Sequence, residues 1–501
     1  MTKLKNTSLA KSLTGIEGLD EITHGGLPTG RTTLISGSAG AGKTVIAMEF
    51  LIHGALDYDE PGVFMAFEES ERDLVANFAS FGFDLEGLEK EGKLSIDHVH
   101  VDRNEISENG GFDLEGLFIR LGNAVDTIHA KRVVLDTIEV LFSAVKSEAI
   151  VRSELVRLFC WLKDRGLTAI VTGERGGSHL TRFGLEEYAA DCVIVLDHRL
   201  EGQISTRRLR ILKYRGTLHE MDEHPFLMGE RGVSVLPLSS VGLNHGASSE
   251  RVSSGIADLD AMLEGKGFFK GSSVLISGTA GTGKTSLAFA FLQAACERGE
   301  RAIYFGFEES KSQTIRNLAS IGLNLQPEVE KGLLHFSTVR PSSLGLEAHL
   351  AAMHQLIKRV KPVVVVMDPI SVFMSISEKD PVKSMLTRLV DFLKMEEITT
   401  LFTHLSNSGQ NLEATEQRIS SIMDTWILMR DVEFGDRRRV MLRILKSRGM
   451  AHSREMVEFM MSGEGIHLGK SHPKEGKHSG HTATTRVEAV SHEVAHGENS
   501  R

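Results

Sequence analysis

Short apolar runs, separated by longer mixed segments, recur along this chain. Four runs in the first half have the length of strands and do not alternate between polar and apolar positions: residues 32–36, 62–67, 132–136 and 168–172. Strands of this kind are buried on both faces, as in parallel sheets. After the first run, residues 45–53 contain no Gly or Pro and have the apolar positions of a helix. The pattern predicts an α/β fold, with a mostly parallel twisted sheet flanked by helices.

This pattern occurs twice. Four segments of the first half recur in the second half, 14–20 at 254–260, 37–44 at 278–285, 67–70 at 307–310 and 211–216 at 444–449. The apolar runs 363–368 and 399–403 are the counterparts of the last two strands. A first offset of 254 − 14 = 240 residues far exceeds a solenoid repeat of about 20–50 residues, so it indicates a duplicated domain. We expect domains at 1–245 and 246–469, joined by the Gly/Ser/Asn-rich stretch 239–254.

The last segment, 470–501, has a different composition. It contains Gly, Ser, Thr and five scattered histidines, with few large apolar groups. Such a segment cannot form a core, so we expect it to be disordered. Its histidines could bind a metal, but solvated spacer residues are the favoured interpretation.

Composition narrows the class of protein. Of the 501 residues, 41% are hydrophobic and 25% are charged, as in ordinary globular domains. No apolar run reaches about 18 residues, so no membrane span is expected. The formal charge of −10 disfavours a general nucleic-acid surface. The N-terminus has no apolar leader, and Cys160, Cys192 and Cys296 are too widely spaced for a disulfide framework, so we expect reduced packing cysteines in a cytoplasmic protein.

Two glycine-rich loops carry the clearest chemistry. Each has the pattern G-x-x-x-x-G-K-T between a predicted strand and a helix, where backbone N–H groups and the helix N-terminus can hold phosphate oxygens. The lysine supplies a charge to the β- and γ-phosphates, and the threonine can ligate Mg²⁺. The predicted loop contacts are Gly37, Ser38, Ala39, Gly40, Ala41, Gly42, Lys43 and Thr44, with Gly278, Thr279, Ala280, Gly281, Thr282, Gly283, Lys284 and Thr285.

An aspartate ends an apolar strand in each half. Asp136 and Asp368 can hold hydrated Mg²⁺ as Walker B residues, beside Thr44 and Thr285. An apolar strand that ends in Asp is also common without any function. The paired glycine loops favour the functional interpretation.

An acidic pair follows the strand after each glycine loop. Glu68-Glu69 and Glu308-Glu309 should lie at the edge of the sheet that holds the nucleotide, because the carboxyl ends of parallel strands meet there. One carboxylate of each pair can orient or deprotonate an attacking oxygen. The alternative is an acidic residue that stabilises a helix N-terminus. We favour catalysis because the pair is present in both halves.

A Lys-x-Arg pair lies late in each half, as Lys213 and Arg215, followed by His219, and as Lys446 and Arg448. On a strand, both cations of a pair would share one face. They are either ordinary solvated charges or, in a ring of subunits, groups that reach a neighbour's γ-phosphate.

Together these motifs resemble the KaiC family of circadian-clock proteins, within the RecA-like ATPases. The resemblance runs from about Leu13 to Gly463 and is carried by the repeated T/S-G-I-x-x-L-D opening, both glycine loops, both Phe-Glu-Glu segments and the runs 172–175 and 213–219. It implies two tandem RecA-like P-loop NTPase domains in a double-ring homohexamer, with ATP·Mg²⁺ between subunits. The first domain would be a slow ATPase, and the second an autokinase and autophosphatase.

The resemblance also implies further site residues. It adds Glu308 as a metal ligand, and nucleotide contacts at Ser80, Arg207, Tyr214, Thr217, His219, Ser286 and Ser447. Two departures are visible. Ile321 replaces an aromatic residue near the base, and the tail does not resemble the family's activator-binding tail.

The implied serine/threonine kinase activity depends on residues 419–425. Ser420 and Ser421 stand at the family's adjacent phosphoacceptor positions, and Thr415 matches a third hydroxyl. By this resemblance, Glu308 would activate the serine hydroxyl and the adjacent subunit's ATP would donate the γ-phosphoryl group. From the residues alone, a Ser-Ser pair is more often part of a polar loop.

Two other classes of function stay open. A nucleic-acid motor would need basic loops, and residues 207–210 and 437–439 are basic, although the acidic total weighs against this class. A scaffold would use ATP only to assemble. The resemblance implies KaiB-like proteins or signalling histidine kinases as partners, in circadian or related signalling.

Overall fold

The computed structural model describes residues 9–99, 114–142, 145, 147–176, 189–201, 204–229, 232–237, 246–376, 379–406, 419–434, 437–463 and 465–470. The predicted disordered tail lies outside these residues except for position 470, and Thr415 lies outside them as well.

The first half contains these elements: β1 (Lys11–Ser12), α1 (Leu19–Ile22), β2 (Leu27–Pro28), β3 (Thr32–Gly37), α2 (Lys43–Asp57), β4 (Gly62–Ala66), α3 (Glu71–Ala79), α4 (Leu85–Lys90), β5 (Leu94–His98), α6 (Glu115–Ile128), β6 (Arg132–Asp136), η1 (Ile138–Val140), α7 (Glu148–Asp164), β7 (Thr168–Glu174), β8 (Cys192–Glu201), β9 (Ile204–Tyr214), β10 (His224–Gly229) and β11 (Gly232–Val235).

The second half contains β12 (Arg251–Val252), α9 (Ala257–Met262), β13 (Phe268–Phe269), β14 (Ser273–Gly278), α10 (Lys284–Glu297), β15 (Ala302–Gly306), α11 (Lys311–Ala319), α12 (Gln326–Glu330), β16 (Leu334–Thr338), η2 (Pro341–Ser343), α13 (Leu346–Val360), β17 (Val364–Asp368), η3 (Ile370–Val372), α14 (Phe373–Ile376), α15 (Lys379–Met395), β18 (Thr399–Leu405), β19 (Thr425–Phe434), β20 (Arg437–Ser447), β21 (Val457–Ser462) and β22 (Gly465–Lys470).

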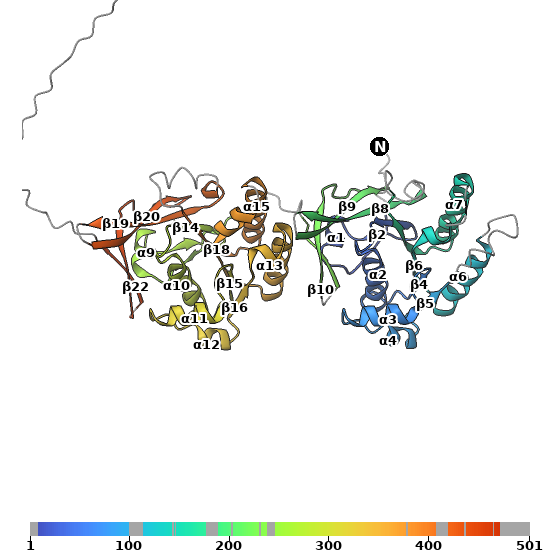
Figure 1. Ribbon diagram of the computed structural model, residues 1–501, viewed down its shortest axis with the longest axis horizontal. Coiled ribbons are helices and arrows are strands. Elements are labelled where there is room, and N and C mark those ends of the chain that lie inside the picture. Colours follow the sequence, from blue (N-terminus) through green and yellow to red (C-terminus); the bar gives the residue numbers. More distant parts are fainter. Residues whose placement is uncertain are drawn as a thin grey trace, which may run out of the picture.

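Each half is built around one nine-stranded sheet (Figure 1). The strand orders are β11-β10-β9-β8-β3-β7-β6-β4-β5 and β22-β21-β20-β19-β14-β18-β17-β15-β16. The strands from β8 to β5, and from β19 to β16, are parallel, whereas β9–β11 and β20–β22 pair antiparallel. The predicted α/β fold with two tandem domains is confirmed, and the four predicted strands of the first half are β3, β4, β6 and β7.

Helices cover both faces of each sheet. In the first half, α2 packs against one face, which includes Ile35 and Phe64. The helices α6 and α7 pack against the other face, which includes Leu34 and Val63. In the second half α10 covers one face, and α13 and α15 cover the other. Successive strand residues are therefore buried on opposite faces, which explains the unbroken apolar runs. Among the described helices, none has both the length and the apolar character needed to cross a bilayer.

Helix α2 ends at Asp57, beyond the stretch without Gly or Pro that reaches His53. Position 54 requires a glycine because the helix passes under Arg132 there, and an added Cβ would be 2.5 Å from Arg132 Cδ. Arg132 is only 1% exposed. Its guanidinium donates to the carbonyl oxygens of Phe50 and Leu13 at 2.7 and 2.9 Å, and to Glu60 at 2.6 Å. These bonds compensate for a buried cation at the start of an apolar strand.

Two expectations from the sequence are corrected. The end of the predicted linker is part of the second half, because Arg251–Val252 form β12 and pair with β13. Cys192 and Cys296 are buried as expected, but Cys160 is exposed. Helix α7 directs Leu158, Phe159 and Leu162 into the core, and Cys160 lies on its outer side.

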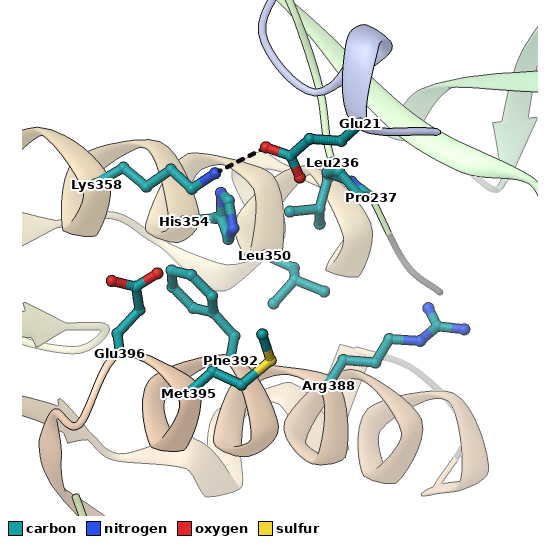
Figure 2. Close-up of a pocket in the computed structure, with 10 residues that line it drawn as sticks. All are labelled: Glu21, Leu236, Pro237, Leu350, His354, Lys358, Arg388, Phe392, Met395 and Glu396. Carbon is teal, nitrogen blue, oxygen red and sulfur yellow. Dashed lines mark hydrogen bonds and ion pairs between the residues drawn. The ribbon is translucent and has the colours of Figure 1, made fainter. Parts of the chain in front are cut away.

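The two halves meet where α13 of the second half faces β10 and the end of the first half (Figures 1 and 2). Leu236 of the first half is buried within the core cluster of the second half. Two ion pairs cross the junction, between Arg208 and Glu347 at 2.9 Å and between Lys358 and Glu21 at 3.3 Å. The junction is thus both apolar and charge-paired.

A cavity of about 260 Å³ lies at this junction (Figure 2). The His354 ring packs on Phe392, with 4.0 Å between the centroids. Burial lowers the pKa of His354 to about 4, so this ring is neutral at neutral pH. The lining contains no residue of either glycine loop, and the cavity is therefore separate from the predicted nucleotide sites.

Candidate nucleotide site in each half

The first glycine loop lies between β3 and α2, as predicted. Gly40 and Gly42 have φ values of +71° and +103°, where a side chain would be strained. Lys43 folds back over the loop, and its Nζ donates to the carbonyl oxygens of Gly37 and Ser38 at 3.0 and 3.1 Å. The ammonium group and the N-terminus of α2 therefore present positive charge at one point, which suits a phosphate group.

The second glycine loop repeats this geometry between β14 and α10. Gly281 and Gly283 have φ values of +80° and +85°. Lys284 Nζ donates to the carbonyl oxygens of Gly278 and Thr279 at 2.9 and 2.7 Å. The two loops are therefore equivalent in backbone and in charge.

Asp136 lies at the carboxyl end of β6, beside the first glycine loop. Thr44 Oγ1 donates to Asp136 Oδ2 at 2.9 Å, and the Thr172 hydroxyl donates to Asp136 Oδ1. Burial is the largest influence on this carboxyl and raises the pKa of Asp136. A hydroxyl and a carboxylate that converge in this way are the hard oxygen donors that Mg²⁺ takes while it keeps several waters. These residues therefore fit a magnesium ion.

Asp368 occupies the same place at the end of β17, but its hydrogen bonds differ. The Thr403 hydroxyl donates to Asp368 Oδ1, as its counterpart does in the first half. Tyr304 Oη, however, donates to Asp368 Oδ2 at 3.0 Å. Thr285 is the second residue of α10, as Thr44 is of α2, so the second site has the same pair of Mg²⁺ donors.

The acidic pairs lie at this same edge of each sheet. Phe67, next to Glu68, donates its backbone N–H to the carbonyl oxygen of Asp136 at 2.8 Å, and Phe307 does the same to Asp368 at 3.0 Å. Helix α3 is capped by Ser70 instead of an acidic residue, and α11 is capped by Ser310. The capping alternative for the acidic pairs is therefore disfavoured.

The two glutamates of each pair have different surroundings. Asn77 Nδ2 donates to Glu69 Oε2 at 3.3 Å, and Asn317 Nδ2 donates to Glu309 Oε2 at 3.4 Å. Burial, followed by the charge of Asp136, raises the pKa of Glu69. The asparagines hold the second glutamate of each pair, which distinguishes Glu69 and Glu309 from Glu68 and Glu308.

Lys213 and Arg215 lie at the amino ends of the parallel strands, whereas the glycine loop lies at the carboxyl ends. Tyr214 ends β9 and pairs with the first residue of β8, which pairs with Thr33 near the start of β3. Gly37 stands four residues further along β3, which at about 3.3 Å per residue is roughly 13 Å away. Lys213 is therefore far from the glycine loop of its own half. Arg215 follows the strand end, so the expectation that both cations lie on one strand is wrong.

In the second half, the cations and the predicted phosphoacceptors come together at the amino ends of the parallel strands. Lys446 Nζ donates to the carbonyl oxygens of Ser420 and Met423 at 2.8 and 2.7 Å. Arg448 donates to the carbonyl oxygen of Ser421 at 2.6 Å. Ser420 is 5% exposed, whereas Ser421 is exposed. The first half has the same lysine contact, from Lys213 Nζ to the Ala190 carbonyl at 2.7 Å.

The remaining predicted contacts are spread over each half. Ser80 follows the last residue of α3 as its C-cap and is exposed. Tyr214 is buried, and its hydroxyl donates to the carbonyl oxygen of Gly26 at 2.8 Å. The others are Arg207 within β9, Thr217 and His219 after it, Ser286 in α10 and Ser447 at the end of β20.

Three arginines of the basic clusters that suggested a nucleic-acid motor are ion-paired with glutamates. Arg208 contacts Glu223 at 3.3 Å and Glu347 at 2.9 Å. Arg438 and Arg439 pair with other glutamates at 3.0 and 2.8 Å. Cations that are neutralised in this way are less suited to phosphate backbones, and this disfavours the motor.

Sequence reasoning missed Tyr304 and the two asparagines. The signal for Tyr304 was available, because alignment of the two halves places Phe64 opposite it (64 + 240 = 304). The asparagines gave no such signal, because their contact with the acidic pair depends on how α3 and α11 are oriented.

The strand order, with a phosphate-binding loop and a strand-end aspartate at the same edge, places both halves in the class of RecA-like P-loop ATPases. The family model "ATPase: KaiC" matches the chain twice, over residues 12–240 and 252–472. The chain therefore belongs to the KaiC family, whose ATPases bind ATP.

Similar proteins span nearly the whole chain. The chain is 49% identical to "Circadian clock protein KaiC2" of Synechocystis sp. over 493 residues, which cover 98% of this chain and 86% of that protein. It is 39% identical to "Circadian clock oscillator protein KaiC" of Synechococcus elongatus over 472 residues, 93% of this chain and 91% of that protein. The KaiC of Acaryochloris marina is also 39% identical, over 96% of this chain and 92% of that protein.

Proposed function

We propose that this chain forms a homohexameric ring in which each nucleotide site is completed by a neighbouring copy. The first half hydrolyses ATP, and the second half transfers the γ-phosphoryl group to Ser421 and Ser420 of the next copy. The observation that carries the proposal is the position of Lys446, Arg448 and the two serines. They lie at the amino ends of the parallel strands, whereas the glycine loop of the same sheet lies at the carboxyl ends.

The register of the second sheet supports transfer between copies. Ser447 pairs with Thr425, which pairs with Val274 near the start of β14. Lys284 follows the far end of that strand. A serine in front of β19 is therefore separated from its own nucleotide by the length of the strand. In a ring, the same serine can face the glycine loop of the adjacent copy.

The residues at the glycine loop have separate roles in the proposed transfer. Lys284 holds the β- and γ-phosphates. Thr285 and Asp368 would hold Mg²⁺, with Glu308 as a further ligand, and the ion would supply positive charge to the phosphate oxygens. Glu308 accepts the proton of the serine hydroxyl as its oxygen bonds to the γ-phosphorus atom. The bond between that phosphorus and the β–γ bridging oxygen breaks, and ADP leaves.

The first half carries the same parts for hydrolysis. Lys43 holds the phosphates, Thr44 and Asp136 would hold Mg²⁺, and Glu68 orients a water molecule as the attacking group. Lys213 and Arg215 of the neighbouring copy stabilise the charge on the transferred group.

The exposed Ser421 is the more accessible acceptor. A phosphate on Ser421 would add about −1.5 to −2 charges beside Arg448 and change the contact between copies. The relatives are named as circadian clock proteins, and we infer that this phosphorylation state signals to a partner of the KaiB or histidine-kinase type.

Incubation of the full chain with ATP and Mg²⁺, followed by mass spectrometry of residues 415–425, tests the proposal. The chain should gain phosphate there, and the variant Ser420→Ala plus Ser421→Ala should gain none. Ser343→Ala removes an exposed serine elsewhere and should behave like the natural chain. Native mass should show six copies. Phosphate that persists in the double variant, or a chain that stays monomeric with ATP, contradicts the proposal. Stimulation of ATP hydrolysis by single-stranded DNA would favour a nucleic-acid motor instead.

A further inference from the structure

One position in the middle of the strand beside the Walker B strand, β4 in the first half and β15 in the second, differs between the halves. Phe64 pairs with Val134, two residues before Asp136. Tyr304 pairs with Val366, two residues before Asp368. The two side chains therefore occupy equivalent places under the Walker B aspartate, and only the second carries a hydroxyl group.

This hydroxyl changes the hydrogen bonds of the aspartate. In the first half, Asp136 Oδ2 accepts from Thr44 Oγ1 at 2.9 Å, so the two proposed Mg²⁺ donors touch each other. In the second half, Asp368 Oδ2 accepts from Tyr304 Oη at 3.0 Å, while Oδ1 accepts from Thr403. Both oxygens of Asp368 thus have a fixed protein donor that is not itself a proposed metal ligand.

The surroundings of Tyr304 are adapted to the larger side chain. Gly306 stands where the first half has Ala66 (66 + 240 = 306). A Cβ at position 306 would lie 2.6 Å from Tyr304 Cε1, so alanine would collide with the ring. The ring also packs on Phe289 and Phe336, with centroid separations of 4.4 and 5.4 Å. Tyr304 is 2% exposed, and its hydroxyl is therefore fixed in direction.

We propose that Tyr304 is a positioning residue of the second nucleotide site, which holds Asp368 away from Thr285 and weakens the hold on the divalent cation relative to the first half. This inference rests on the proposed role of Asp368 in binding Mg²⁺. A carboxylate oxygen that already accepts from a buried phenol has less capacity to accept from the waters of a hydrated cation. Without the phenol, Oδ2 would lose its donor, and the cation's waters would satisfy it instead.

The test measures binding of Mn²⁺ to the full chain with a non-hydrolysable ATP analogue, by electron paramagnetic resonance. Asp136→Asn and Asp368→Asn assign the bound Mn²⁺ to the first and second sites. Tyr304→Phe should lower the dissociation constant of the second site by about tenfold, the size expected for one hydrogen bond to a charged group. The first site should not change. Phe64 shows that this fold accepts phenylalanine at the equivalent place.

A reciprocal variant gives the matched control. Phe64→Tyr with Ala66→Gly should weaken Mn²⁺ at the first site, and Tyr304→Phe within the Asp368→Asn chain should change nothing. Unchanged Mn²⁺ affinity at the second site of Tyr304→Phe, or an equal change at both sites, overturns the inference. So does retention of both Mn²⁺ ions in Asp368→Asn. Because Mn²⁺ binding needs no phosphate transfer, absence of serine phosphorylation would contradict the proposed function and leave this result standing.

Discussion

The first and second halves hold an equivalent lysine against equivalent backbone positions, but the residues just before those positions differ. Lys213 Nζ donates to the Ala190 carbonyl, and Lys446 Nζ donates to the Met423 carbonyl, its counterpart (190 + 233 = 423). The same offset places Glu187 and Tyr188 opposite Ser420 and Ser421. The duplicated fold therefore gives each half a Lys and an Arg at the amino ends of its parallel strands, which we propose contact a neighbour's nucleotide. At these two positions of the sequence the second half has serines where the first half has Glu187 and Tyr188, and in our account this is the difference between phosphorylation and hydrolysis.

The largest expected effect comes from removal of the trans arginines. Arg448→Ala should lower phosphate incorporation by about 10³-fold, because a trans arginine that stabilises the transferred group contributes effects of this order. Arg215→Ala should lower ATP hydrolysis in the first half and leave serine phosphorylation measurable. Timed phosphopeptide analysis and phosphate release measure the two activities. Equal loss of both activities in each variant would contradict the division of labour between the halves.

Loss of the two proposed bases should likewise affect two different activities. Glu308→Gln should slow phosphorylation by about 10²–10⁴-fold, the usual contribution of a general base. Glu68→Gln should slow hydrolysis only. Glu309→Gln is the matched control, because Asn317 holds this side chain, and its effect should be smaller. If Glu309→Gln is the more damaging variant, the assignment of the base within the pair is wrong.

The two serines should differ because their exposure differs. Ser421→Ala should reduce the initial rate of phosphate incorporation by about tenfold, whereas Ser420→Ala should reduce it less, since a 5% exposed hydroxyl must first move to be attacked. Site-resolved mass spectrometry over time gives the order of modification. Faster appearance of phosphate on Ser420 would reverse this order.

A smaller effect is expected on stability. Gly306→Ala should lower the free energy of unfolding by about 1–3 kcal/mol, because the added Cβ overpacks the space beside the Tyr304 ring. Combined with Tyr304→Phe it should be less destabilising, since the first half carries Phe64 together with Ala66 at the equivalent positions. Denaturant unfolding of the full chain measures both. A neutral Gly306→Ala would show that the ring has room to shift.

Much of the fold could be predicted from the sequence, because short apolar runs and glycine spacing are local signals. The runs at 32–36 and 62–67 became β3 and β4, and the Lys43 loop lies where the pattern placed it. The antiparallel strands β9–β11 gave no comparable signal of their pairing. The role of Arg132 was also hidden, because its carbonyl partners at Phe50 and Leu13 are brought together only by tertiary packing.

The site was predicted unevenly for the same reason. Residues at the carboxyl edge, such as Asp136 and Glu68, follow from the rule that parallel strand ends share one edge. The distance of Lys446 from its own glycine loop could not be read from spacing, because it depends on the antiparallel pairing of β20 with β19. Tyr304 required a comparison of the two halves.

Mixing two inactive variants tests transfer between copies most directly. Glu308→Gln lacks the proposed base, and Ser420→Ala plus Ser421→Ala lacks the acceptors. If the base acts on the hydroxyl of the next copy, mixed rings place an intact base beside intact serines, and phosphate should appear on the Glu308→Gln chain. Each variant alone should incorporate almost no phosphate. Rings confirmed to be mixed by native mass that still gain no phosphate would contradict transfer between copies.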